Sequence, residues 1–150
     1  MDTLVAPQAA VVTYSIALHT DEPSQFVDIT ERVAECVREA GLTQGLAVVS
    51  SRHTTAAIVV NEHEPELIRD LQRLLEDIAP QDAHYSHNGA PCGAFEEPNG
   101  HAHCRALLLG ASASLPVVNG SLMTGRWQRI FLVELDRARP RTVTVTLLGV

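Results

Sequence analysis

Histidine is frequent in this chain, and its distribution is the first indication of chemistry. Seven histidines occur in 150 residues, and five of them lie between residues 63 and 103. Imidazole carries protons near neutral pH and is the commonest metal-binding side chain. A cluster of this kind therefore indicates either metal coordination or acid–base chemistry. The five are His63, His84, His87, His101 and His103.

Single histidines of this set differ in what their neighbours indicate. His53 follows Arg52 and precedes two threonines at the expected edge of a strand, a setting that suits an anion, a metal or an ordinary hydrogen-bonded histidine. His101 and His103 form an HxH pair, but at the start of an expected helix they would diverge by about half a turn. We expect His101 to face solvent. His87 lies in an expected loop, where by itself it indicates no function.

Further polar residues border apolar segments. Asn61 and Glu62 end a strand that is otherwise wholly apolar, so their polar groups emerge at the sheet edge where a helix begins. Asp70 borders the apolar stripe of that helix and faces either a cleft or solvent. The only tryptophan, Trp127, lies in the segment 125–128, where it either stacks on a planar ligand or anchors a core or an interface.

Composition excludes several classes of function. A formal net charge of −7 with no basic stripe argues against nucleic-acid binding. All the basic residues are arginine, which excludes lysine Schiff-base chemistry. Three cysteines without paired spacing, and no apolar run of membrane-spanning length or export signal, predict a cytoplasmic protein without a membrane partner.

The hydrophobic pattern predicts one α+β domain over residues 1–150. Helical periodicity marks residues 27–40 and 65–80, and a shorter helix is expected from about 99 to 110. Residues 81–99 form an expected long loop, and no role is assigned to Cys92 within it. An Asn-Gly pair at 119–120 predicts a hairpin. The expected strands are 11–18, 45–51, 56–61, 115–118, one near Leu122, 127–135 and 142–148.

Taken in order, these segments resemble the YjbQ-like family, some of whose members are assigned a secondary thiamine-phosphate synthase activity. The similarity extends from the first expected strand to the last. The resemblance implies a mixed, largely antiparallel sheet with two long helices and one short helix, assembled as a homotrimer. The segments that match are 53–56, 61–62, 85–87, 102–103 and 125–128.

The resemblance also implies a site, position by position. A divalent metal ion, zinc or magnesium, would be held by His53, His87 and His103. The catalytic residues would be Glu62, Asp70 and Gln128, and the ligand-binding residues would be Thr54, Asn61, Arg126 and Trp127. The sequence departs from the usual family pattern at Arg126, where threonine is usual, and at Cys104, where an aliphatic residue is usual.

The activity implied is the joining of a pyrimidine diphosphate to a thiazole phosphate with release of pyrophosphate, so the expected partner is a small phosphorylated metabolite. An imidazole-rich site suits zinc better than the magnesium usual in diphosphate chemistry. Two alternatives therefore stay open: a metal-dependent hydrolase that uses the same residues, and a noncatalytic trimeric protein that binds a metal or a metabolite.

Overall fold

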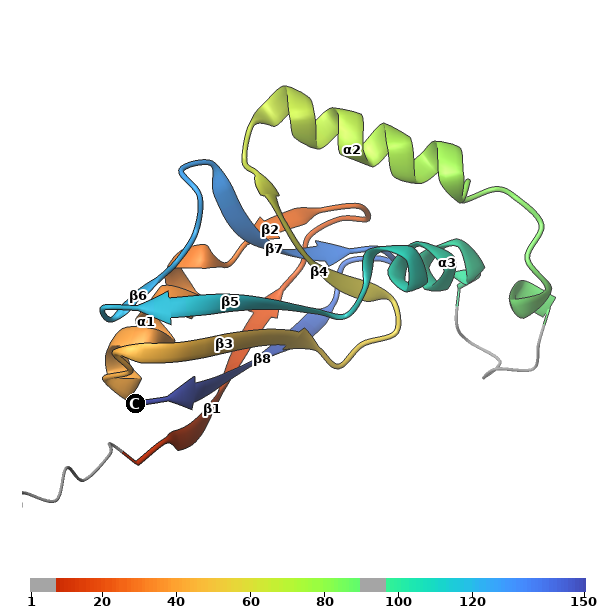
Figure 1. The fold of residues 1–150 in the computed structure, drawn as a ribbon. Helices are drawn as coiled ribbons and strands as arrows, with labels where there is room; N and C mark the ends of the chain where they lie inside the picture. The colour runs from red at the N-terminus through yellow and green to blue at the C-terminus, as the bar shows by residue number, and fades with distance from the viewer. Residues whose placement is uncertain (1–7, 90–96) are drawn as a thin grey trace, which may run out of the picture.

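The computed structural model describes residues 8–89 and 97–150 and has an α+β fold with two antiparallel sheets (Figure 1). The larger sheet has the strand order β1-β8-β3-β5-β6, and the smaller has the order β2-β7-β4. The strands are β1 (Ala10–His19), β2 (Phe26–Asp28), β3 (Gln44–Ser51), β4 (Ala56–Glu62), β5 (Ser112–Val118), β6 (Ser121–Leu122), β7 (Gln128–Glu134) and β8 (Pro140–Gly149). The helices are α1 (Thr30–Ala40), α2 (Pro65–Ile78), the 3-10 turn η1 (Ser86–Gly89) and α3 (Gly100–Leu109).

Alternation along β8 decides which face of the larger sheet is buried. Val143, Val145 and Leu147 are buried, whereas the threonines between them are only partly covered. The buried face meets α1, which contributes Val33 and Val37 to the same apolar core. A strand with one buried face has apolar residues at every second position, and this alternation allowed the strand at 142–148 to be predicted from the sequence.

The central strand of the smaller sheet is covered on both faces. Ile130 and Leu132 join the core under α1, while Phe131 and Val133 pack in a second cluster with Leu75 of α2 and residues of α3. A strand buried on both sides reads as a continuous apolar run, as β7 does. This strand connects the two layers and extends between the two cavities described below.

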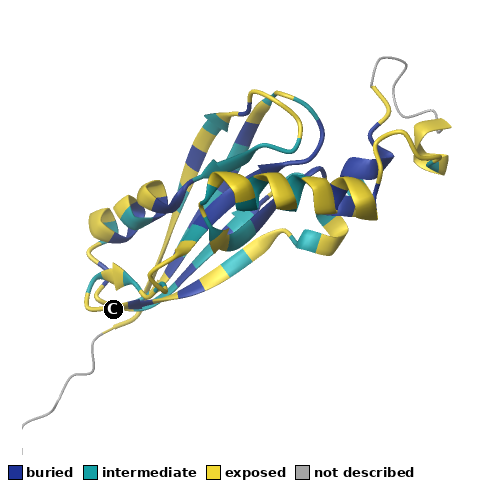
Figure 2. Ribbon diagram, turned by 90° about the horizontal axis from the view of Figure 1, so that it is seen from above, coloured by how far each residue is buried: buried dark blue, intermediate teal, exposed yellow. Residues whose placement is uncertain are grey.

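Helix α2 crosses over the smaller sheet and leaves part of its apolar stripe uncovered (Figures 1 and 2). Leu75 is buried, but Leu74 and Ile78 are 51% and 52% exposed. The helix begins where predicted, with Pro65 in its first turn and the Glu64 carboxylate accepting the N–H groups of Glu66 and Leu67.

The first predicted helix was placed too early in the sequence. Residues 26–28 form β2, which pairs with β7, and the helix starts at Thr30. Asp28 marks the change, because its Oδ1 accepts hydrogen bonds from both the N–H (3.0 Å) and the hydroxyl (2.6 Å) of Thr30. The carboxylate thus satisfies an N–H that the first helical turn would leave free.

The predicted hairpin is confirmed. Asn119 and Gly120 both have positive φ values, 50° and 76°, and join β5 to β6, as a two-residue hairpin turn requires. The predicted 81–99 loop contains η1, while Cys92 lies outside the described residues. In the part of the chain that is described, no helix combines the length and apolarity needed to cross a membrane.

Candidate functional site

A cavity of about 300 Å³ lies where α3 faces the start of β4. His53 and Thr54 line it from the connection between β3 and β4, and His103 lines it from α3. We call this cavity, together with the adjacent His87, the histidine pocket. The rest of its wall is apolar and is formed by Ala56, Ala106, Leu107 and Ala111.

His87 reaches the histidine pocket through the turn η1. Its ring meets the ring of His103 edge to face, with centroids 4.7 Å apart and 74° between the planes. The neighbouring Asn88 fixes this turn, because its side-chain oxygen accepts the N–H of Gly100 at the start of α3 (2.9 Å). The fold therefore brings together the three histidines that were predicted as metal ligands.

The donor set fits a metal only in part. Two imidazoles in contact suit a transition metal such as zinc. Among residues 8–89 and 97–150, however, no group of three His, Cys, Asp or Glu side chains is placed to hold an ion. Within the described residues, His87 and His103 therefore supply only part of a protein coordination sphere.

His53 is already engaged by the backbone. Its Nε2 accepts a hydrogen bond from the N–H of Thr142 over 3.0 Å, so a neutral ring carries its proton on Nδ1. Burial, and next the guanidinium of Arg141, lower the pKa of His53 and favour this neutral form. In this position His53 offers the pocket an N–H donor, and it would ligate a metal only by releasing Thr142.

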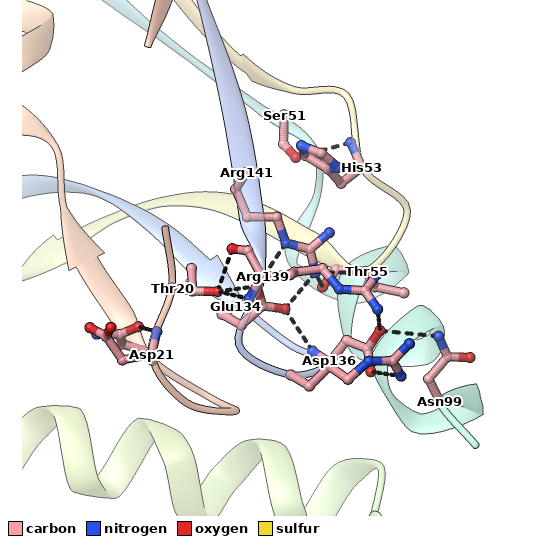
Figure 3. Close-up of polar contacts among 12 residues, drawn as sticks. Thr20, Asp21, Ser51, His53, Thr55, Asn99, Glu134, Asp136, Arg139 and Arg141 are labelled. Atoms are coloured by element: carbon pink, nitrogen blue, oxygen red, sulfur yellow. Dashed lines mark hydrogen bonds and ion pairs between the residues drawn. The ribbon is translucent and has the colours of Figure 1, made fainter. Parts of the chain in front are cut away.

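A buried network of charged side chains lies behind His53 (Figure 3). The side chains of Arg141 and Glu134 are 1% and 0% exposed, and Arg141 Nε donates to Glu134 Oε2 over 2.7 Å. Arg141 also donates to the hydroxyl of Thr55 (3.0 Å). Because Arg141 directly precedes Thr142, the network fixes the N–H group that orients His53.

His101 does not face solvent, as the sequence had led us to expect. It is only 3% exposed, its ring lies 6.5 Å from that of Tyr85, and its buried Nδ1 has no hydrogen-bond partner in the described part of the chain. Burial, and next the charge of Arg105, lower its pKa. Helix α3 has apolar side chains on several sides, so its sequence could not reveal which histidine of the pair points inward.

A second cavity, of about 390 Å³, opens beside the end of β4 and the start of β7. We call it the tryptophan pocket. Trp127 is 60% exposed, and the guanidinium of Arg126 lies 4.6 Å from its ring centroid. The indole is therefore an exposed aromatic surface and not a core anchor. The lining residues are Asp28, Glu62, His63, Glu64, Arg126, Trp127 and Arg129.

The remaining predicted site residues line neither of these pockets. Gln128 lines an adjoining cavity of about 380 Å³, where its side-chain oxygen accepts the N–H of Gly125 (2.8 Å). Asn61 borders a small apolar cavity of about 100 Å³ beside α2. Asp70 is 58% exposed and pairs with Arg73 over 2.6 Å, so in the single chain it lies on the solvated flank of α2.

Strand β4 separates the two pockets. Ala56, its first residue, lines the histidine pocket, and Glu62, its last, lines the tryptophan pocket. Six residue steps of about 3.3 Å place the two ends about 20 Å apart. One chain thus presents two groups of predicted site residues that do not face each other.

Both the sequence and the fold of this chain are similar to those of known proteins. A family model described as "UPF0047 protein YjbQ-like" matches residues 14–150. The chain belongs to this family. A UPF0047 protein of Methanothermobacter thermautotrophicus is 40% identical over 139 residues, which cover 93% of each chain. The UPF0047 protein YugU of Bacillus subtilis is 31% identical and is matched over 90% of this chain and 98% of its own.

Solved structures agree with this assignment to the UPF0047 family. The crystal structure of a YbjQ-like protein of unknown function from Sulfolobus solfataricus has 37% identity and a TM-score of 0.89, covering 95% of this chain and all of the other. A hypothetical protein from Aeropyrum pernix has 37% identity and a TM-score of 0.85, covering 93% and 99%. The resemblance to the YjbQ-like family is confirmed.

Sequence reasoning missed four residues that line the tryptophan pocket of this UPF0047 protein, namely Asp28, His63, Glu64 and Arg129. Asp28 accepts hydrogen bonds from His63 (3.0 Å) and Arg129 (2.8 Å), so the three form one cluster. His63 had a signal, because it belongs to the histidine-rich interval and follows Glu62. Asp28 and Arg129 had none, because they reach the cluster from β2 and β7, far apart in sequence.

Proposed function

We propose that this UPF0047 protein is a metal-assisted, homotrimeric secondary thiamine-phosphate synthase. It would join a pyrimidine diphosphate to a thiazole phosphate and release pyrophosphate. The observation that carries the proposal is the division of the site: one end of β4 bears a pair of contacting imidazoles, and the other bears a carboxylate, an arginine and an exposed indole. Each half supplies what the other lacks for diphosphate chemistry.

A neighbouring subunit would bring the halves together. Leu107, which lines the histidine pocket, is 84% exposed, and the adjacent Leu108 is 64% exposed. Near the tryptophan pocket, Met123 is 64% exposed and Trp127 60%. Apolar side chains this exposed favour burial against a partner. When two different surfaces of one chain meet head to tail, closed rotation gives a ring, and a homotrimer is such a ring.

In the composite site, the chain's own residues would bind and orient the two substrates. Arg126 has no ion-pair partner among residues 8–89 and 97–150 and would neutralise phosphate charge, while Trp127 would stack on a heterocycle. His87 and His103, with Glu62 of the neighbouring subunit, would hold a divalent ion, zinc or magnesium. When bound, the ion would supply charge neutralisation at the diphosphate. His53 would donate its Nδ1 hydrogen to an anionic oxygen.

The bond changes are simple. The carbon–oxygen bond between the pyrimidine methylene and the diphosphate breaks, and its electron pair leaves with pyrophosphate. The thiazole nitrogen then supplies the electron pair of the new carbon–nitrogen bond. Stabilising the leaving group is the main demand, so charge and orientation matter more than a nucleophilic side chain.

The first test is a pyrophosphate-release assay with each precursor alone and with both together, in the presence of zinc or magnesium. Release that needs both precursors is the result expected of the synthase. Release of phosphate or pyrophosphate from one precursor alone would replace it with the metal-dependent hydrolase. Metal or metabolite binding without any product would leave a noncatalytic binding protein.

The composite site has a separate test by subunit mixing. His103→Ala and Glu62→Gln each damage one half, so both homotrimers should be inactive. Subunits refolded together at equal amounts should regain about one quarter of the wild-type activity, because about one interface in four joins two intact halves. His87→Ala mixed with His103→Ala damages the same half twice and should regain nothing. Equal failure of both mixtures would contradict the composite site.

A further inference from the structure

Among the described polar groups that line the tryptophan pocket, the Asp28 carboxylate has the most hydrogen-bond partners. Its Oδ1 accepts the two hydrogen bonds from Thr30, and its Oδ2 accepts Arg129 Nε (2.8 Å) and lies 3.0 Å from His63 Nδ1. Burial alone would raise its pKa, but the hydrogen bonds from Arg129, Thr30 and His63 outweigh burial and lower the pKa to about 2. Asp28 is therefore ionised at neutral pH and can only accept hydrogen bonds.

This charge determines the form of the neighbouring imidazole. An acceptor at 3.0 Å from Nδ1 requires the hydrogen of a neutral His63 to be on Nδ1, which leaves a lone pair on Nε2. The ring also meets Phe131 edge to face, with centroids 5.3 Å apart, so its plane is fixed by a second contact. Asp28 and Phe131 thus orient the ring from two directions.

The rest of His63 faces the cavity. Its side chain is 50% exposed and lines the tryptophan pocket, and Nε2 has no hydrogen-bond partner among residues 8–89 and 97–150. The Glu62 carboxylate lines the same wall and likewise has no partner in that part of the chain. The Glu64 carboxylate is different, because the first turn of α2 already occupies it.

The positive groups of the pocket are the guanidiniums of Arg126 and Arg129. Arg129 is paired with Asp28 and Glu31, which leaves Arg126 as the unpaired cation beside the indole among the described residues. Arg126 also lines the adjoining cavity of about 380 Å³ with Arg38 and the hydroxyl residues Ser121 and Thr124. The pocket therefore combines the hydrogen-bond acceptors of His63 and Glu62 with the guanidinium of Arg126, which lies over the Trp127 ring.

From this arrangement we propose that the tryptophan pocket recognises a planar nitrogen heterocycle that carries an N–H donor. His63 Nε2, oriented by Asp28, would accept that hydrogen, the ring would stack on Trp127, and a phosphate on the same ligand would extend towards Arg126. This inference rests on the proposed function, since it identifies the pyrimidine end of the diphosphate substrate as the part that this pocket binds. It adds His63 as a specificity-determining residue and Asp28 as its positioning residue.

Binding can be tested without turnover, because Trp127 is the only tryptophan. Quenching of its fluorescence should be titrated with 4-aminopyrimidine and with 4-methoxypyrimidine, which has no N–H donor. We expect the amine to bind about 3- to 10-fold more tightly, the worth of one neutral hydrogen bond. In His63→Phe, which keeps an aromatic ring against Phe131, the two affinities should become equal. His84→Phe, at an exposed position outside the cavity, should keep the difference.

The tautomer provides an independent readout. Long-range proton–nitrogen NMR correlations should show His63 with its hydrogen on Nδ1, and Asp28→Asn should abolish that preference. Equal affinity of the two pyrimidines in wild type, or an Nε2-protonated ring, would overturn the inference while leaving pyrophosphate release intact. Discrimination by His63 in a protein that releases no pyrophosphate would instead refute the synthase and retain the heterocycle pocket.

Discussion

Removing one partner of the Glu134–Arg141 ion pair should destabilise the fold strongly. Both side chains are buried, so Glu134→Leu leaves a guanidinium in the core without a counter-charge, and Arg141→Met leaves a carboxylate there. Each loss of a buried partner costs about 3–5 kcal/mol of the free energy of unfolding. Because domains are typically stable by only about 5–15 kcal/mol, either change removes a large share of the total.

The double variant Glu134→Leu/Arg141→Met should cost less than the sum of the two single changes. It leaves no buried charge, and apolar replacement of a buried pair is often close to neutral. The N–H of Asp136 would still lose its acceptor, at about 1–3 kcal/mol, whereas the hydroxyl of Thr20 keeps the Arg139 carbonyl as an acceptor at 3.1 Å. The two single changes together cost about 6–10 kcal/mol, so we expect a double cost of about 1–3 kcal/mol and a coupling of at least about 3 kcal/mol.

Urea unfolding followed by far-ultraviolet circular dichroism measures these values, since the exposed Trp127 reports poorly on the core. All variants should be compared at one protein concentration, because subunit association would shift the apparent stability. Arg141→Lys serves as a milder control that keeps the charge and loses the fork. Strict additivity, or single changes below about 1 kcal/mol, would show that the network does not hold these strands together.

Four further outcomes are expected. His103→Ala should lose bound metal in elemental analysis and His84→Ala should keep it; equal metal in both would refute the ligand assignment. The depressed pKa of Asp28, about 2, should stabilise the fold by about 2 kcal/mol above pH 4, and this share should be lost as pH falls towards 2. Acid unfolding of Asp28→Asn should lack that step. Leu107→Glu should dissociate the proposed homotrimer in analytical ultracentrifugation, and an unchanged sedimentation coefficient would contradict the proposed interface. Asp70→Asn should change the free energy of unfolding by less than about 0.5 kcal/mol but should lower the activity of the proposed synthase. Unchanged activity would indicate that Asp70 is only a solvated side chain.

The same ion pair predicts a pH dependence near the histidine pocket. Burial alone would raise the pKa of Glu134, but hydrogen bonds from Arg141, Asp136 and Thr20 outweigh it and lower the pKa. A carboxyl whose pKa is lower in the folded state stabilises the fold above its unfolded pKa, and this contribution is lost as pH falls through the folded value. Acid should therefore loosen the Arg141–Thr142 segment that orients His53.

Most of the secondary structure could be predicted because local signals and packing agree. The Asn119–Gly120 turn needs positive φ at both residues, and β8 alternates because one face is buried. The start of α1 was predicted wrongly because Val27 fits a helical stripe as well as a short strand. Residues 26–28 form a strand because β2 pairs with β7, whose residues are more than 100 positions away in the sequence.

The candidate site was predictable only to the extent that its residues share a segment. His101 is one example. Either histidine of the His101–His103 pair could point to the core, and the sequence does not show that His101 lies next to Tyr85 and near Arg105. The Asp28–His63 pair is a second example, because β2 and β4 are distant in the sequence and β7, which pairs with both, holds them in one sheet. Residue types indicated the chemistry, and the division into two pockets required three-dimensional structure.

The length of β4 means that the proposed synthase would need the proposed assembly for catalysis. It pairs with β7 along its whole length, from Ala56 opposite Glu134 to Glu62 opposite Gln128. A paired strand does not shorten, so no hinge within this segment can bring its ends together. The imidazole pair and the tryptophan pocket can then serve one ligand only across a contact between chains. The activity of the proposed synthase should consequently fall on dilution below the dissociation constant of the proposed homotrimer, even in protomers that remain folded.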